Sequence, residues 1–179
     1  MHPHLAEVFG RLNDSRAALR AAVDAVPQGL RRTRPSPGRW SVAEVLEHLA
    51  LVDRLFAERM VEAIDHARTV GLGPERQARE GLPADVARRM SDRGEAREAR
   101  EAVRPAGAID AAAAWDDLEA AREAVHQAAA GADGLALGTV RAEHRLFGSL
   151  TIYQWVELTA AHELRHADQI REIGAALSR

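Results

Sequence analysis

The sequence predicts an all-α protein, a four-helix bundle that forms one domain over residues 1–179. Apolar residues recur with the helical period in four long stretches of the chain. Strand-like alternation is absent, and aromatic residues make up only 4% of the sequence. A segment of about forty residues separates the second stretch from the third, which is far more than a helical hairpin needs. These three observations together favour helices packed on helices.

The first two helices have clear start and stop signals. We expect the first over residues 3–26, because Pro27 follows it directly. The second is expected over residues 41–69. Ser41 suits the N-cap position, and Glu44 three residues later completes a capping box.

The other helices are predicted in the same way. The third is expected over residues 110–130, with Asp110 as its N-cap and Gly131 as its stop. The fourth is expected over residues 151–177. Within the long connection, the pattern predicts one short helix around residues 85–100.

The long connection predicts the order of helix directions. A helix of 28 residues is ~42 Å long. A connection of this size is long enough to run back along the second helix, so that the third helix starts at the same end of the molecule as the second. The second and third helices would then run parallel, in an up-down-down-up arrangement. In that layout His48, two turns into the second helix, comes level with the C-terminal half of the fourth.

Composition excludes several classes of function. The net charge of −3 gives no electrostatic reason to expect a nucleic-acid partner. Every basic residue is arginine, which is more typical of genomic base-composition bias than of phosphate recognition. No segment approaches the ~18 apolar residues of a membrane span, and the N-terminus lacks a signal pattern, so we expect a cytoplasmic protein without a membrane partner. The chain has no cysteine, so any sulfur chemistry needs an external thiol.

One motif carries most of the chemical information. His162 and His166 bracket Glu163 in an H-E-x-x-H pattern, and two histidines four residues apart on a helix can grip one metal ion. In a zinc peptidase Glu163 would be the general base, and a third ligand would follow downstream. Only thirteen residues follow His166, and none is histidine. A third ligand must therefore come from upstream.

His48 is the upstream histidine in a comparable setting. It borders the apolar stripe of the second helix, while both motif histidines lie within the stripe of the fourth. Three histidines therefore point into one interior. A di-iron carboxylate site would also need a glutamate three residues before His48, and Val45 stands there.

These residues also carry a family resemblance. The sequence resembles the DinB-like superfamily, which includes bacillithiol- and mycothiol-dependent enzymes, in the phrases Gly38-Arg39-Trp40-Ser41, Glu44, His48-Leu49, His144 to Thr151, Gln154-Trp155 and His162 to Ile170. The resemblance implies a four-helix bundle with His48, His162 and His166 as metal ligands. One departure is visible, since Arg145 stands where many relatives have proline.

The sequence also predicts positions for other residues relative to these three histidines. Gln169, seven residues after His162, is expected to contact the ligands or the substrate. Glu44 is a weaker candidate for such a contact, because its role in the capping box already accounts for a glutamate at this position. Trp40 is expected at the rim of the pocket. His144 is expected toward the opposite end of the bundle and is not predicted as a ligand. Glu163 points about 100° away from His162 on the helix and is expected to be exposed or interhelical rather than a base.

Two functions remain open from the sequence. The first is a metal-dependent enzyme that binds a divalent metal, Zn²⁺ or Ni²⁺, and uses a low-molecular-weight thiol for S-transfer to a small-molecule substrate, or a related hydrolase. The second is a non-catalytic, stress-related bundle whose metal is structural or absent. The alanine-rich third helix permits close approach of another helix, so a homodimer is expected in either case.

Overall fold

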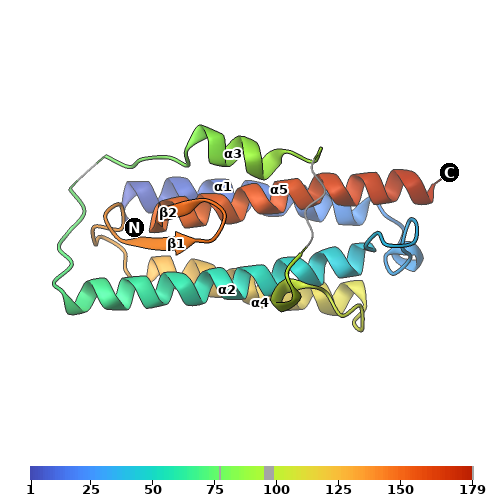
Figure 1. The fold of residues 1–179 in the computed structure, drawn as a ribbon, viewed down its shortest axis with the longest axis horizontal. Helices are drawn as coiled ribbons and strands as arrows, with labels where there is room; N and C mark the ends of the chain where they lie inside the picture. The colour runs from blue at the N-terminus through green and yellow to red at the C-terminus, as the bar shows by residue number, and fades with distance from the viewer. Residues whose placement is uncertain (77, 95–98, 179) are drawn as a thin grey trace.

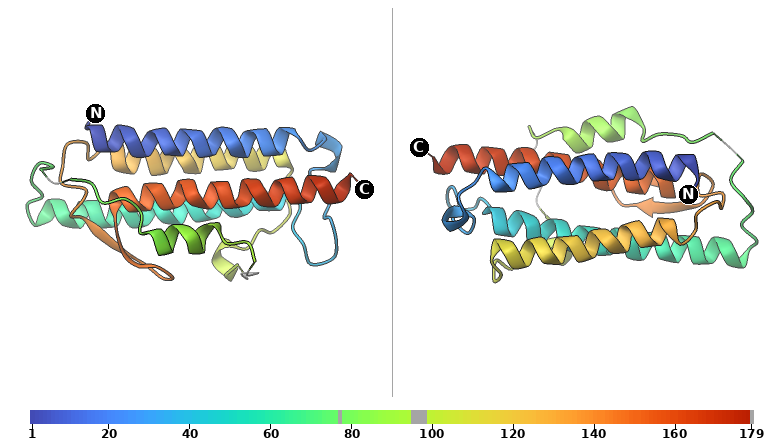
Figure 2. Two further views of the ribbon diagram at one scale, coloured as in Figure 1. Left: turned by 90° about the horizontal axis from the view of Figure 1, so that it is seen from above. Right: turned by 180° about the vertical axis from the view of Figure 1, so that it is seen from behind.

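The computed structural model describes residues 1–76, 78–94 and 99–178 and is mostly helical, as the sequence predicts. Four long helices lie side by side (Figure 1). They are α1 (Pro3–Asp24), α2 (Val42–Thr69), α4 (Ala111–Ala130) and α5 (Ile152–Leu177). Helix α2 packs mainly against α4, and α1 packs mainly against α5. Helices α1 and α5 begin at one end of the molecule, while α2 and α4 begin at the other (Figure 2).

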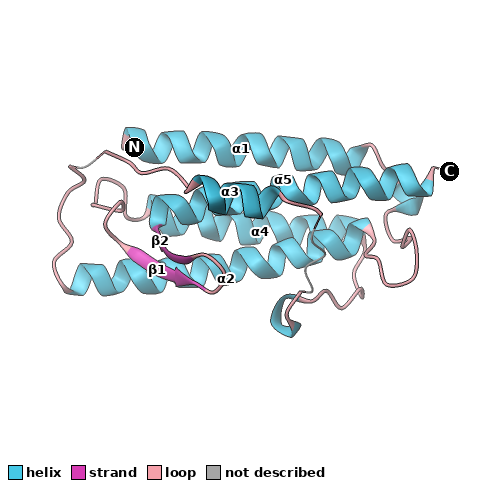
Figure 3. Cartoon of the chain, turned by 45° about the horizontal axis from the view of Figure 1, so that its top comes forward, coloured by secondary structure: helices cyan, strands magenta, loops and turns pink. Residues whose placement is uncertain are grey.

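Shorter elements surround the long helices. Helix α3 lies against α5 (Figure 3). Two short 3-10 helices, η1 and η2, belong to the connections. Their bounds are Gln28–Leu30 for η1, Ala84–Ser91 for α3 and Glu101–Val103 for η2. None of the described helices has a stretch apolar and long enough to cross a membrane.

The structure contains a small antiparallel hairpin that the sequence analysis missed. Strands β1 (Arg141–His144) and β2 (Gly148–Thr151) pair directly before α5. Each strand has only four residues, and β1 is not buried on either face, so no apolar alternation marks it. Its turn is closed by Gly148, whose φ of 71° suits a residue without a side chain. The expectation that the chain lacks strands was therefore wrong.

The helix ends follow local signals closely. Ser41 and Glu44 form the predicted capping box of α2, in which the Ser41 hydroxyl accepts from the Glu44 amide at 3.3 Å and the Glu44 carboxylate accepts from the Ser41 amide at 2.8 Å. Asp110 caps α4 through the amides of the next turn. Helix α1 ends at Asp24, two residues earlier than expected.

The short helix of the connection is also smaller than expected. It ends at Ser91, and of the predicted span 85–100, residues 95–98 lie outside the described part of the chain.

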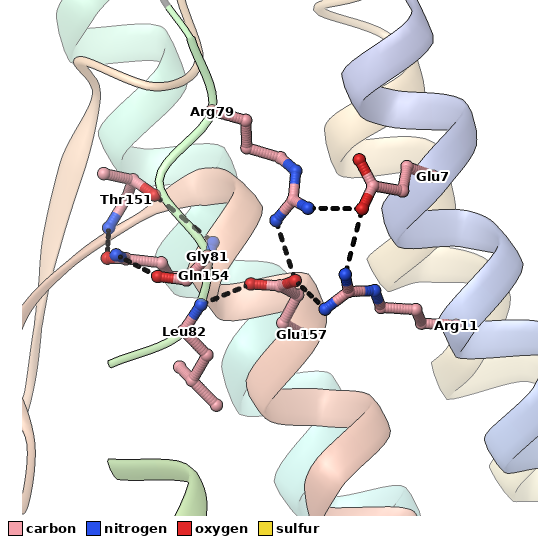
Figure 4. A network of polar contacts seen from close by, with 8 residues as sticks. All are labelled: Glu7, Arg11, Arg79, Gly81, Leu82, Thr151, Gln154 and Glu157. Carbon is pink, nitrogen blue, oxygen red and sulfur yellow. Dashed lines mark hydrogen bonds and ion pairs between the residues drawn. The ribbon is translucent and has the colours of Figure 1, made fainter. Parts of the chain in front are cut away.

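A buried carboxylate holds the connection against the long helices α1 and α5 (Figure 4). Glu157 of α5 is 4% exposed and accepts hydrogen bonds from the amide of Leu82 at 2.6 Å and the guanidinium of Arg79 at 2.8 Å. It also accepts from Arg11 of α1 at 2.7 Å, so it joins three segments. The segment before α3 is thereby fixed on α1 and α5, which positions α3 beside the site described below.

The hydrophobic core has two parts, divided by a layer of buried polar side chains. One part surrounds the C-terminal half of α2 and the beginning of α5, and the other surrounds the N-terminal half of α2 and the end of α5. The buried polar residues at the level where the two parts meet include Ser15, His48, Asp53, Arg122, His162, Glu163, Arg165 and His166. Such groups are costly to bury without partners, so this layer is where function is expected.

Candidate metal centre

Three buried histidines meet within the polar layer. His48 comes from α2, and His162 and His166 come from consecutive turns of α5. One ring nitrogen of each lies within 4.8 Å of the others, which is close enough for a single ion to touch all three. The Nε2 atoms of His162 and His166 are 3.0 Å apart. The structure thus brings together the three histidines that the sequence singled out.

In two of the three histidines, a neighbouring residue fixes which ring nitrogen faces the other histidines. The carbonyl oxygen of Val103 can only accept, so His48 donates its Nδ1–H to it at 2.7 Å and keeps a lone pair on Nε2. His166 likewise donates Nδ1–H to the amide oxygen of Gln169 at 2.8 Å. These contacts are the kind of outer hydrogen bonds that orient metal-binding imidazoles.

The residues present fit a divalent cation. Burial lowers the pKa of His48, and burial followed by repulsion from neighbouring cations and imidazoles lowers the pKa of His162 and His166 well below the ordinary value. The rings are therefore neutral at neutral pH, which is the form that binds metals. The Nε2 atoms of His162 and His166, both buried, face each other at 3.0 Å. A cation bound to the three Nε2 atoms would take up the lone pairs that these atoms direct at one another.

The histidines form the floor of a cavity of about 380 Å³. Its wall comes from the turn before α2, from α2 itself, α3, η2, the hairpin and α5. Trp40 and Gln169 both line it, and the Trp40 ring lies 4.9 Å from the ring of His48. The cavity is large enough for a small molecule.

Comparison with known proteins places the chain in a family. The model of the DinB superfamily matches residues 11–170. The chain belongs to the DinB superfamily. It is also 30% identical over 147 residues to the uncharacterized protein YuaE of Bacillus subtilis (strain 168), a match that covers 82% of this chain and 84% of that protein. No solved structure gave a significant match.

Glu44 does not reach the cavity of this DinB superfamily member. Its carboxylate caps α2 and accepts a hydrogen bond from Arg34 at 2.9 Å, and it is absent from the residues that line the wall. Those contacts account for its burial without any contact to a substrate.

His144 lies at the cavity, and the expectation that it sits toward the opposite end was wrong. It lines the wall, with its ring 5.7 Å from Phe56 and 5.3 Å from Trp155. The expectation assumed that the chain before Thr151 continues away from α5. Instead the hairpin folds back along the bundle, and four residues of strand cover ~13 Å in that direction. His144 is not part of the group that could share one ion.

Glu163 is interhelical and fully buried, at 0% exposure. It accepts a hydrogen bond from the Ser15 hydroxyl at 2.5 Å, forms an ion pair with Arg122 of α4, and lies 3.6 Å from Arg16 of α1. Of the two expected positions, exposed or interhelical, the structure shows the interhelical one, because α5 is packed on more than one side. It does not line the cavity, so it is not placed as the general base of a peptidase.

Proposed function

We propose that this chain is a metal-dependent enzyme in which His48, His162 and His166 hold a divalent cation, Zn²⁺ or Ni²⁺, and the cavity above them receives a low-molecular-weight thiol and a small electrophile. Hydrolysis at the same site is the related alternative. We further propose that the four long helices act as an up-down-down-up four-helix bundle that carries this site. The observation that supports the proposal best is the convergence of three neutral, buried imidazoles at the floor of a cavity.

His48, His162 and His166 would hold the cation through neutral imidazoles, and the cation would supply the Lewis acidity that lowers the pKa of a thiol or a water molecule. In S-transfer the thiol loses its proton to solvent, its sulfur forms a bond to the electrophilic carbon, and the leaving group departs with the bonding electron pair. The chain has no cysteine of its own, so the thiol must come from outside.

The residues around the ligands have separate tasks in this proposal. The carbonyl of Val103 and the amide of Gln169 hold two imidazoles in the tautomer that directs Nε2 to the cation. Trp40 and Phe56 cover the ligands with apolar surface, which limits the access of water.

Metal analysis tests the proposal directly. Protein purified without a histidine tag is expected to carry close to one equivalent of zinc or nickel, and His48→Ala is expected to lose most of it. His66→Ala is the matched control, because His66 is an exposed histidine of the same helix and does not line the cavity.

Activity is then measured with cysteine as the thiol and monochlorobimane as the electrophile. Thiol conjugation that depends on His48 supports the enzyme. Bound metal without conjugation or hydrolysis would favour the non-catalytic alternative. If His48→Ala retains its metal, the three-histidine site is wrong.

A further inference from the structure

The cavity wall is strongly cationic although the chain as a whole is acidic. Five arginines line it, and none of the described lining residues is an aspartate or a glutamate. The complete chain carries a net charge of −3, so this wall differs in sign from the average of the molecule. The five are Arg39, Arg93, Arg100, Arg145 and Arg165. A concave wall of one charge concentrates small ions of the opposite charge.

Three of these arginines hold parts of the protein together. Arg93 donates twice to the carboxylate of Glu172, at 2.9 and 2.6 Å, and Arg39 lies 3.8 Å from the same carboxylate. Arg165 donates to the carbonyl of Met90 at the end of α3, at 3.2 Å. These contacts join the turn before α2, the end of α3 and helix α5. Their main role is to build the wall.

Arg100 and Arg145 are different. Neither has an ion pair or a hydrogen bond from its side chain to any residue that the structure describes, and both are exposed at the cavity. They come from separate segments, directly before η2 and in the turn of the hairpin. The pKa of the nearby His144 is lowered to about 4, chiefly by burial and secondly by the charges of these two arginines. His144 is therefore neutral and contributes a hydrogen-bonding group beside the two positive charges.

We propose that Arg100 and Arg145 form a subsite for the oxyanion group, a carboxylate or a phosphate, of an acidic small molecule whose other end reaches the three histidines. The inference rests on the proposed function, because it takes the histidine site as the floor of the same cavity. Guanidinium groups offer paired donors that match the two oxygens of such an anion. A cavity of about 380 Å³ suits a small molecule of this kind rather than a polymer.

Binding to metal-free protein tests the subsite independently of the metal. We expect succinate, measured by isothermal titration calorimetry, to bind at least tenfold more tightly than its neutral analogue succinamide. Comparison of succinate with inorganic phosphate then shows whether the subsite prefers a carboxylate or a phosphate. The double variant Arg100→Gln/Arg145→Gln is expected to bind succinate at least fivefold more weakly than the unchanged protein. Arg59→Gln/Arg141→Gln removes the same charge from exposed arginines that do not line the cavity, and should stay within twofold.

A second pair of ligands is measured on zinc-loaded protein. Mercaptosuccinate is expected to bind at least tenfold more tightly than 1-thioglycerol, and the preference should disappear in Arg100→Gln/Arg145→Gln at unchanged zinc content. Equal binding of the acidic and neutral probes, or a preference that survives in this variant, overturns the subsite. Succinate binding that follows the expected pattern in a protein that fails to bind zinc would support the subsite and reject the proposed function. Binding of zinc and thiols without any preference for acidic ligands would be consistent with the proposed function and would reject the subsite.

Discussion

Replacing Glu163 tests how the buried charges in the bundle are balanced. Two carboxyl groups share the guanidinium of Arg122, since Glu163 pairs with one side of it and Asp53 lies 3.3 Å from its Nε. All three side chains are buried. Burial raises the pKa of Asp53 to about 7; the positive charge of Arg122 opposes this increase, and the negative charge of Glu163 adds to it. The pKa of Asp53 therefore lies near neutral pH.

This arrangement predicts that the two carboxyl groups substitute for each other. Removing one partner of a buried ion pair ordinarily costs about 3–5 kcal/mol, because a charge is left uncompensated. In Glu163→Gln, however, the pKa of Asp53 falls and Asp53 ionises beside Arg122, so we expect a loss of only about 1–3 kcal/mol. Asp53→Asn replaces a group whose pKa is raised to near neutral pH with a neutral one, and should cost about 1 kcal/mol or less.

The double variant should be worse than the sum of the two single changes. Without either carboxylate Arg122 has no buried counter-charge, and we expect a total cost of about 3–5 kcal/mol with a coupling of at least ~1 kcal/mol. Urea unfolding at pH 7, followed by far-UV circular dichroism, gives these free energies. Glu123→Gln, an exposed change beside Arg122, should stay within about 0.5 kcal/mol. Additive effects of the two substitutions would refute the shared-cation interpretation.

Three further predictions follow from particular contacts. Gln169→Ala should weaken zinc binding by about 10–100-fold in a competition titration, because it frees the ring of one ligand. The folded-state pKa of Asp53, about 7, lies above its ordinary value of 3.8, so the folded state binds more protons between these pH values and stability falls as pH rises through that window. The free energy of unfolding, measured with urea, should fall by at most about 1.4 kcal/mol per pH unit, and this dependence on pH should become weaker in Asp53→Asn. Glu157→Ala should speed hydrogen exchange of the Leu82 amide, since that amide donates to the lost carboxylate; unchanged exchange would show that the connection is held by other contacts.

Local chemistry in the sequence determined where α2 and α4 begin and which three histidines are the candidate metal ligands. Capping depends on side chains within three residues of the helix start, so Ser41 and Asp110 could be assigned directly. The spacing of His162 and His166 guarantees that both rings share one face of any helix that contains them. The inward position of His48 followed from the apolar period of its own helix.

Tertiary structure decided what lies around those ligands. A helical wheel defines one apolar stripe, but α5 packs against α1, α2, α3 and α4, so a residue 100° away from that stripe can still be fully buried, as Glu163 is. Its partner Arg122 lies 41 positions earlier in the chain, on α4, and no local pattern links the two. The return of His144 and Arg145 to the cavity likewise depends on a hairpin too short and too exposed to leave a periodic signal. The three candidate ligands could be found from local periodicity, whereas the buried charges and the cavity wall depend on contacts between segments that are distant in sequence.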